Sequence, residues 1–220
     1  MLPVPHFTIT GARREEHPMA QHFKLDLHKK YKSEYVMPKQ PVFVAVGPAK
    51  YLAITGHGAP GGQHFQAHVS ALYSVAYTLK MAEKLAGHDF KVCHLEGQWW
   101  AEDAPDFRAR RPQEWEWRLL IRVPEFITQH ELDAAIQSVM ARDKAPLAGE
   151  VKLLQLTEGR CVQVLHTGPY AGEETTVQRM REMAERNGAK FRGPHHEIYL
   201  SDPNRVPKER LRTILRYPVE

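Results

Sequence analysis

The stretch HHEIYLSDP, residues 195–203, has the pattern of a strand that ends at a turn on Asp202-Pro203. Side chains alternate along a strand, so Glu197 and Tyr199 share one face while Ile198 and Leu200 share the other. The second face is apolar, and we expect the first to point away from the main apolar face. A carboxylate beside a phenol can activate a water and stabilise a developing negative charge. A solvated strand face is the competing interpretation.

The composition is that of a folded, water-exposed protein. The chain has 220 residues, of which 42% are hydrophobic and 25% charged, values typical of globular domains. No apolar run reaches the length of a membrane span, and the first residues lack the basic and apolar regions of a signal peptide. Cys93 and Cys161 both lie in apolar strand patterns, which predicts buried thiols in a reducing compartment. We therefore expect a cytoplasmic protein with no membrane contact.

Charge gives little support for a nucleic-acid partner. The net charge of +4 is modest and spread over the chain. Residues 1–40 form a polar extension rich in Lys and His, without the paired helices of a helix-turn-helix reader. Arg108, Arg110 and Arg111 lie in a polar loop over 101–113 that could touch phosphates, but a solvated loop is the favoured interpretation. We expect no nucleic acid as a partner.

The order of elements repeats. The patterns predict strands over 42–46, 51–57, 90–97, 114–122, 151–156, 161–170, 195–201 and 211–216, with a turn at 157–160, and helices over 64–86, from 128 to before Pro146, and over 173–187. Thr128 and Glu131 have the spacing of a capping box. A glycine precedes a strand glutamate by nine residues in Gly87–Glu96 and again in Gly188–Glu197. Duplication is the simplest explanation.

The predicted fold is α+β. Two strand–helix–strand–strand modules, about 42–125 and about 150–218, would form one domain over 41–220. A pseudo-twofold would join them into an antiparallel sheet with the helices on one face and a ligand cleft between the halves. Glu96 and Glu197 would face this cleft from opposite halves, and Trp99, Trp100, Trp115 and Tyr199 would line it. Core packing is the alternative for any single tryptophan, but their grouping favours a flat aromatic ligand.

The histidines give no metal site. His64 and His68 are four residues apart on the predicted 64–86 helix, a spacing that can place two ligands together. No carboxylate or cysteine is placed to complete a ligand set, so hydrogen-bonded or solvated histidines are favoured. We expect neither a metal nor an organic cofactor.

Five segments together resemble the GyrI-like small-molecule-binding family over about residues 40–220. The segments are residues 71–80, Leu95-Glu96-Gly97-Gln98-Trp99-Trp100, Trp115-Glu116-Trp117, His166-Thr167-Gly168-Pro169-Tyr170 and residues 195–203. The family fold is a duplicated strand–helix–strand–strand module, in agreement with the repeat. The branch with Glu-Gly-x-Trp-Trp and His-His-Glu-Ile-Tyr resembles the cyclopropanoid cyclopropyl hydrolases, which detoxify DNA-alkylating compounds of the yatakemycin and CC-1065 type.

The resemblance implies a hydrolase that opens a strained cyclopropane by adding water. We assign catalysis to Glu197, which would orient or deprotonate water, and to Tyr199 beside it. The expected substrate contacts are Glu96, Trp99, Trp100, Trp115, Trp117, Tyr170 and His57. The partner would be a flat aromatic small molecule, bound by a monomer or a homodimer.

Two other functions are compatible with the sequence. The first is a binder without turnover that sequesters aromatic or cationic compounds, with a glutamate as counter-charge, as in the effector domains of multidrug-binding regulators of the family. The second is an adaptor that binds a protein. The adaptor leaves the Glu197–Tyr199 pair and the tryptophans unexplained, and the absence of a DNA-reading pattern weakens a regulator.

Overall fold

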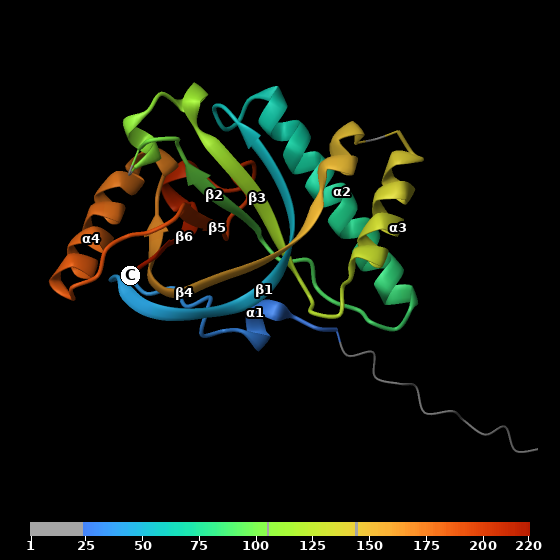
Figure 1. The fold of residues 1–220 in the computed structure, drawn as a ribbon, viewed down its shortest axis with the longest axis horizontal. Coiled ribbons are helices and arrows are strands. Elements are labelled where there is room, and N and C mark those ends of the chain that lie inside the picture. Colours follow the sequence, from blue (N-terminus) through green and yellow to red (C-terminus); the bar gives the residue numbers. More distant parts are fainter. Residues whose placement is uncertain (1–23, 105, 144) are drawn as a thin grey trace, which may run out of the picture.

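A ring of antiparallel strands carries helices on its outside (Figure 1). The computed structural model describes residues 24–104, 106–143 and 145–220. The strands are β1 Val42–His57, β2 Leu95–Trp100, β3 Glu116–Val123, β4 Lys152–Thr167, β5 His195–Tyr199 and β6 Arg212–Pro218. The helices are α1 Leu27–Lys30, α2 Gln63–Leu85, α3 Gln129–Met140 and α4 Glu173–Arg186.

The sheet is a closed barrel in the order β1-β3-β2-β5-β6-β4. The predicted duplication is visible in the element order, because β1-α2-β2-β3 is followed by β4-α4-β5-β6. The two modules join through equivalent strands, β1 with β4 and β2 with β5. We predicted an antiparallel sheet without predicting its closure. Closure follows from the two seams, because β1 pairs with β4 on one side while β2 pairs with β5 on the other.

The ends of the elements agree with their local chemistry. Thr128 and Glu131 form the predicted capping box at the start of α3. Gly87 follows α2 with a φ of +91°, a left-handed conformation that glycine adopts without strain. The predicted turn over 157–160 is wrong, because β4 runs through it as one strand of 16 residues. Gly159 lies within this strand with a φ of +73°, a left-handed conformation that glycine adopts without strain.

The outer face of the barrel carries the main apolar cores. Under α2 and α3 lies a cluster that includes Leu72, Trp117 and Leu119, and under α4 lies a second that includes Val164 and Met180. The strand pairing puts Glu197 and Tyr199 on this same outer face, since Gly97 is opposite Glu197 and Leu119 is opposite Gly97. The prediction that Glu197 and Tyr199 point away from the main apolar face is therefore wrong.

The inner face of the barrel is where the unexpected charges lie. Glu96, Glu158, His196 and Arg216 are all buried there, at 0 to 2% exposure. His196 Nε2 lies 3.0 Å from Glu96 Oε2, and its Nδ1 lies 2.8 Å from Glu158 Oε1. Arg216 Nη1 donates to Glu158 Oε2 at 2.7 Å. Buried charges at such distances are each paired, as a low-dielectric interior requires.

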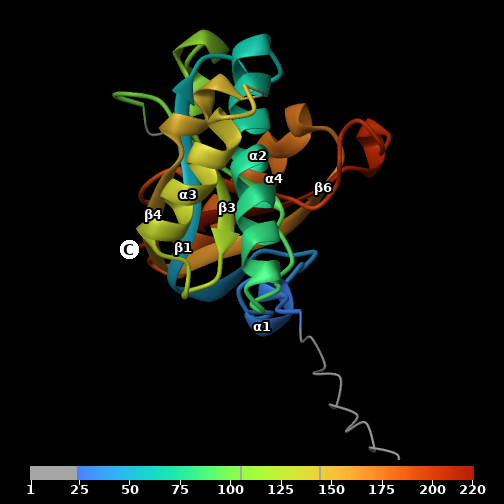
Figure 2. The same cartoon turned by 90° about the vertical axis from the view of Figure 1, so that its right-hand side faces the viewer.

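The segment with α1 lies against one end of the barrel and enters its interior (Figure 2). Glu34 Oε2 accepts a 2.6 Å hydrogen bond from Arg122, and the Tyr35 hydroxyl donates to Glu96 Oε1 at 3.2 Å. Leu27 is 2% exposed in the core under α2. Within the predicted N-terminal extension, the described residues 27–35 thus pack into the fold, while residues 1–23 lie outside the described part of the chain.

Cys93 and Cys161 are buried free thiols, as predicted. Burial raises the pKa of each to about 12, so both remain protonated and unreactive at neutral pH. None of the helices in the described segments of the chain is both long and apolar enough to cross a bilayer.

Candidate functional site

Glu197 lies at the seam between the two repeats. It is on β5 of the second repeat, directly opposite Gly97 on β2 of the first. Its strand neighbour His195 is opposite Trp99 in the same way. The outer face at this seam lies between the core under α2 and the core under α4. Side chains from both repeats therefore meet around one carboxylate.

The first contacts of Glu197 come from its own strand. Glu197 is 6% exposed, and its Oε1 lies 3.1 Å from Nε2 of His195. The Tyr199 hydroxyl hydrogen-bonds to Glu197 on the other side. It also accepts a 3.0 Å hydrogen bond from Nε1 of Trp99. His195 and Trp99 thus hold the carboxylate and its phenol neighbour in one orientation.

Gly97 makes this arrangement possible. A Cβ at position 97 would lie 2.7 Å from the Tyr199 hydroxyl oxygen and 2.9 Å from Trp99 Nε1. Such distances are shorter than van der Waals contact, so any side chain there would displace the hydrogen-bonded pair. The glycine of the Glu-Gly-x-Trp-Trp segment is therefore explained by the close approach of Tyr199.

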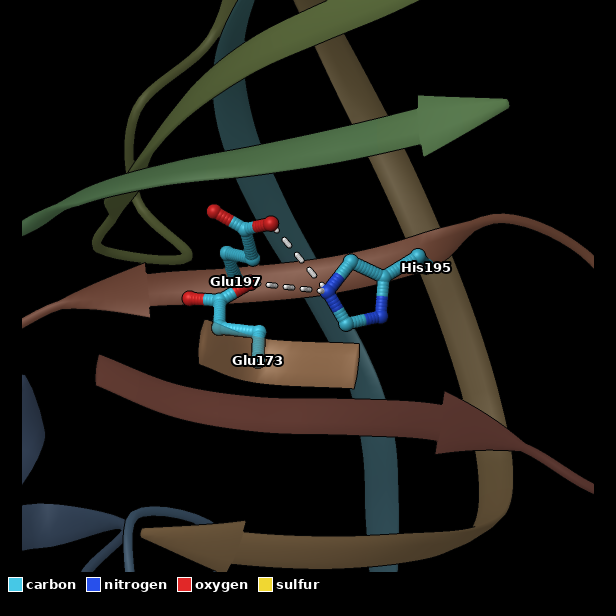
Figure 3. Close-up of side chains that lie close together, drawn as sticks. All are labelled: Glu173, His195 and Glu197. Carbon is cyan, nitrogen blue, oxygen red and sulfur yellow. Dashed lines mark ion pairs between the residues drawn. The ribbon is translucent and has the colours of Figure 1, made fainter. Parts of the chain in front are cut away.

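Two further charges reach the site from outside the strand. Glu173 is in the first turn of α4 and is 1% exposed, and its Oε2 lies 3.9 Å from His195 Nε2 (Figure 3). Arg108, from the short helix Phe107–Ala109, places Nη2 3.2 Å from both Glu173 Oε2 and His195 Nε2. Asp106 caps that helix by accepting from the backbone N–H of Arg108. This cap holds the arginine in place.

The two carboxylates have opposite pKa shifts. Burial and the charge of Glu197 raise the pKa of Glu173 to about 7. Burial also acts to raise the pKa of Glu197, but the hydrogen bond and charge of His195, the Tyr199 hydroxyl and Arg108 outweigh it, so the net shift is downward. Like charges at this distance cannot both ionise freely. At neutral pH Glu197 is the ionised member, which suits a base.

Arg108 bears on whether this cluster is a metal site. Glu173, His195 and Glu197 each offer a ligand atom, and these atoms lie within 4.8 Å of one another. Arg108 already places a positive charge 3.2 Å from two of the three side chains. A cation would meet repulsion from the guanidinium, so the cluster fits an ion-paired acid–base group better than a metal centre.

A chain of packed aromatic rings lies next to the Glu197 cluster. Trp99 packs against Phe65 at 5.9 Å between ring centroids, and Phe107 against Trp115 at 4.8 Å. Tyr170 meets the ring of Tyr199 edge-on at 5.9 Å and is 39% exposed. These rings come from α2, β2, the 107–115 loop and the short turn before α4. They form an apolar wall of the kind that flat ligands use.

Four of the predicted residues are linked to Glu197 through contacts that begin at Tyr199. Tyr199 and Trp99 are hydrogen-bonded to each other, Tyr170 packs on Tyr199, and Trp115 packs on Trp99 with ring centroids 6.2 Å apart. Their roles in binding or catalysis stay predictions.

Glu96 does not lie with Glu197. It is opposite Ile198 on the inner face of the barrel, where it contacts His196 and Tyr35. The prediction that the two glutamates face one cleft is therefore wrong. The prediction treated Glu96 and Glu197 as equivalent because each follows a glycine by nine residues. A shift of one residue along a strand, however, moves a side chain to the opposite face of the sheet.

The other three predicted contacts also lie elsewhere. Trp117 is fully buried under α2 and donates from Nε1 to the carbonyl of Gly58. Trp100 is on the inner face of β2. The guanidinium of Arg118 lies over its indole ring, 5.7 Å from the ring centroid. His57 is exposed at the end of β1, with its ring 5.7 Å from that of His64. Trp117 is thus a core residue, and neither Trp100 nor His57 shows a contact with the Glu197 cluster.

Sequence reasoning missed His195, Glu173 and Arg108 as site residues. His195 shares the strand face of Glu197 and Tyr199, so the alternation in residues 195–199 contained the signal. Arg108 was placed in a solvated loop, yet its side chain is 21% exposed and pairs with Glu173. No local pattern links Arg108 to Glu173, because the pairing depends on the fold.

Two hollows open near the second repeat. One of about 350 Å³ is lined by Trp100, Arg118, Gly193 and Pro194. The other, about 620 Å³, is lined by residues that include Arg181, Phe191 and Tyr217. Its volume falls in the range of small-molecule sites. Tyr217, which lines this hollow, packs on the ring of His195 with the ring centroids 4.7 Å apart. The hollow therefore adjoins the Glu197 cluster. A ligand cleft running between the two halves stays a prediction.

Comparison with known proteins identifies relatives over most of the chain. Residues 39–220 match the family described as GyrI-like small molecule binding domain. A solved structure of an uncharacterized conserved protein from Listeria innocua is 36% identical, with a TM-score of 0.83, and the alignment covers 90% of this chain and 100% of that chain. No functionally curated protein matches the chain.

Two further solved structures, both described as hydrolases from Listeria innocua, match equally well. They are 34% and 35% identical, with TM-scores of 0.80 and 0.82. Each alignment covers 90% of this chain and 100% of the relative. Relatives at this identity and coverage share the fold of this chain.

Proposed function

The chain belongs to the GyrI-like small-molecule-binding family, and we propose that it is a hydrolase that opens the cyclopropane of flat, DNA-alkylating aromatic compounds of the yatakemycin and CC-1065 type. Two relatives at 34% and 35% identity are described as hydrolases, which supports hydrolysis as the reaction class. The observation that carries the proposal is a buried, ionised Glu197 held between His195 and Tyr199 beside an aromatic wall. Such an enzyme would protect a cell from genotoxins.

The chemistry requires one water and one base. These compounds carry a strained three-membered ring conjugated to a dienone. The water oxygen attacks a ring CH₂, the strained C–C bond breaks, and its electron pair moves through the ring system to the carbonyl oxygen. The water gives up one proton and the resulting phenolate takes one, so the net change is the addition of one H₂O. The ring CH₂ becomes a CH₂OH group, so the alkylating reactivity is lost in this step.

Glu197 would take the proton from the attacking water. Its lowered pKa keeps it ionised at neutral pH, and His195 Nε2 lies 3.1 Å from one of its two oxygens. The Tyr199 hydroxyl donates its proton to Glu197 while accepting from Trp99, so its role is to orient the base. A base held in this way contributes about 10²–10⁴-fold to rate.

The aromatic wall would hold the substrate. The rings of Phe65, Trp99, Phe107 and Trp115 form a contact chain, and Tyr170 stands half-exposed at its edge beside Tyr199. Offset and edge-on contacts between aromatic rings add about 0.5–1.5 kcal/mol each beyond area burial. A long flat polycycle would therefore bind with its reactive ring near Glu197.

Ring opening by the purified protein tests the proposal. The protein is mixed with a cyclopropane-containing alkylator of this class, and the product is followed by mass and absorbance. We expect many turnovers, each adding the mass of one water. Glu197→Gln should slow turnover by about 10²–10⁴-fold. Glu174→Gln, an exposed carboxylate one residue from Glu173, is the matched control and should leave the rate unchanged.

Two other outcomes would overturn the hydrolase. Binding of one equivalent without turnover would assign the chain a sequestering role, in keeping with a small-molecule-binding family. Turnover that survives Glu197→Gln unchanged would remove Glu197 as the base, and the observation that carries the proposal would lose its meaning.

A further inference from the structure

Glu173 is a second buried carboxylate that the reaction above does not use. It is 1% exposed, and its Oε2 lies 3.2 Å from Arg108 Nη2 and 3.9 Å from His195 Nε2 (Figure 3). Among the described residues its Oε1 has no hydrogen-bond partner, although it is buried. Leaving a buried charged oxygen unpaired is costly, which favours a proton on this carboxyl.

The contacts of the two carboxyl groups lead to the same result. Glu173 and Glu197 are both buried next to His195, and Arg108 pairs with Glu173. His195 Nε2 lies 3.1 Å from Glu197 Oε1, whereas Glu173 Oε1 has no hydrogen-bond partner among the described residues, so the proton belongs on Glu173.

We propose that Glu173 works in its neutral form as a positioning residue for Glu197. This proposal rests on the hydrolase function argued above. Neutral Glu173 accepts from Arg108 through Oε2 and so fixes the guanidinium beside His195. His195, whose Nε2 lies 3.1 Å from Glu197 Oε1, then stays in place and keeps that carboxylate ionised. Because the reaction builds negative charge on the substrate oxygen, ionisation of Glu173 would add an opposing charge and slow it.

The other charged groups around the cluster do not replace Glu173 in this role. Those that face it are Arg108 and Asp106 from the 101–109 loop, Tyr170 before α4, Arg181 on α4, Tyr199 on β5 and Tyr217 on β6. Burial raises the pKa of Tyr170 to about 12 and also raises those of Tyr199 and Tyr217, so none of these phenols titrates near neutrality. The pKa of Glu173, about 7, supports the assignment made from geometry.

The pH profile of kcat/KM tests the proposal on the active enzyme. The wild type should lose activity above about pH 7, by about tenfold per pH unit, as a single group ionises. Glu173→Gln imitates the neutral carboxyl and keeps an oxygen for Arg108, so its profile should stay flat to within twofold over this range. Glu173→Ala cannot position Arg108, and a misplaced base should cost about 10²-fold at every pH.

A direct proton measurement separates this inference from the proposed function. Full-length protein labelled with ¹³C in the glutamate carboxyl carbon is titrated by NMR, without substrate. We expect one buried signal with an inflection near pH 7 that disappears in Glu173→Gln and remains in the exposed-site control Glu174→Gln. If that inflection is present but no turnover occurs, the hydrolase fails and the protonation of Glu173 stands.

Either of two results would overturn the inference. The Glu173 signal could titrate near its ordinary value of about 4.3, which would make it ionised at neutral pH. Alternatively, Glu173→Gln could show the same alkaline loss of kcat/KM as the wild type, which would assign that loss to another group.

Discussion

At the scale of single residues, the Glu197 site depends on hydrogen bonds that join the two repeats. Tyr199 comes from the second repeat and Trp99 from the first, and their 3.0 Å hydrogen bond crosses the seam. Tyr199 gives its own proton to Glu197, so one phenol connects the base to the neighbouring repeat. Gly97 is part of the same arrangement, because it leaves room for the Tyr199 hydroxyl.

Gly97→Ala is expected to destabilise the protein and damage the site. The added Cβ would lie 2.7 Å from the Tyr199 oxygen, so Tyr199 must move, and overpacking of this kind costs about 1–3 kcal/mol. Urea unfolding measures the free energy. Gly47→Ala is the control, because its nearest neighbour, Glu34 Oε1, is 3.8 Å away. Equal stability of the two variants would contradict the close approach.

Tyr199→Phe is expected to leave the indole N–H of Trp99 without an acceptor. A buried donor that loses its partner costs about 1–3 kcal/mol, and urea unfolding should show a loss of that size. Tyr77→Phe removes a hydroxyl from a tyrosine that is 56% exposed and should change the free energy of unfolding by less than about 0.5 kcal/mol. Matching losses in the two variants would argue against the Trp99–Tyr199 bond.

At the scale of elements, the strands of the barrel have two different faces. The outer face packs on α2, α3 and α4, while the inner face carries Glu96, Glu158, His196 and Arg216 as one paired network. The segment that carries α1 adds Glu34 to it. This network is a buried electrostatic core, and its stability depends on pH.

The network predicts a loss of stability at alkaline pH. Burial acts to lower the pKa of His196, but Glu158 and Glu96 outweigh it and raise the pKa to about 9. A histidine with a raised pKa contributes stability that is complete below its unfolded value of about 6.5 and is lost as pH rises through 9. Urea unfolding between pH 6 and 10 should show a decline of about 3 kcal/mol at most. His196→Gln should flatten that decline, and a wild-type curve that is already flat would refute the pairing.

Glu34→Ala tests how the α1 segment joins the barrel. Arg122 is 2% exposed and would lose its 2.6 Å carboxylate partner, and breaking a buried ion pair from one side costs about 3–5 kcal/mol. The free energy of unfolding in urea should fall by this amount. Glu125→Ala, on an exposed glutamate, is the control. A loss below about 1 kcal/mol would show that the pair contributes little net stability.

At the scale of the whole molecule, neither repeat has a complete sheet by itself. The closed ring exists only because β1 pairs with β4 and β2 with β5. The core under α2 and the core under α4 therefore stand on one shared barrel. The base and its aromatic wall lie where the two meet, so the site is a property of the joined repeats.

This topology predicts one cooperative unfolding transition for both repeats. Leu72→Ala, in the α2 core, and Met180→Ala, in the α4 core, should each lower the single transition by about 2–5 kcal/mol. Tryptophan fluorescence reports mainly on the first repeat, which holds every tryptophan, whereas far-UV circular dichroism reports on both. Coincident curves are expected. Separate midpoints for the two probes would show that the repeats unfold independently.

The sequence by itself determined the element order and the composition of the key strand. Periodicity located α2, α3 and α4 within a few residues, because core-facing positions recur at the helical interval. The duplication could be recognised in the sequence because both copies keep the same order of strands and helices. Alternation in residues 195–199 put Glu197 with Tyr199, and would equally have put His195 with them.

Only the tertiary structure decided which face is which and what meets across the seam. A strand pattern fixes which side chains share a face but not which face turns inward, so Glu96 was paired with Glu197 and lies on the opposite side of the sheet. Arg108 and Glu173 are 65 residues apart in sequence and 3.2 Å apart in space. Barrel closure makes that contact, and long-range pairing leaves no periodic trace in a sequence because it depends on strand register and helix packing rather than on neighbours along the chain.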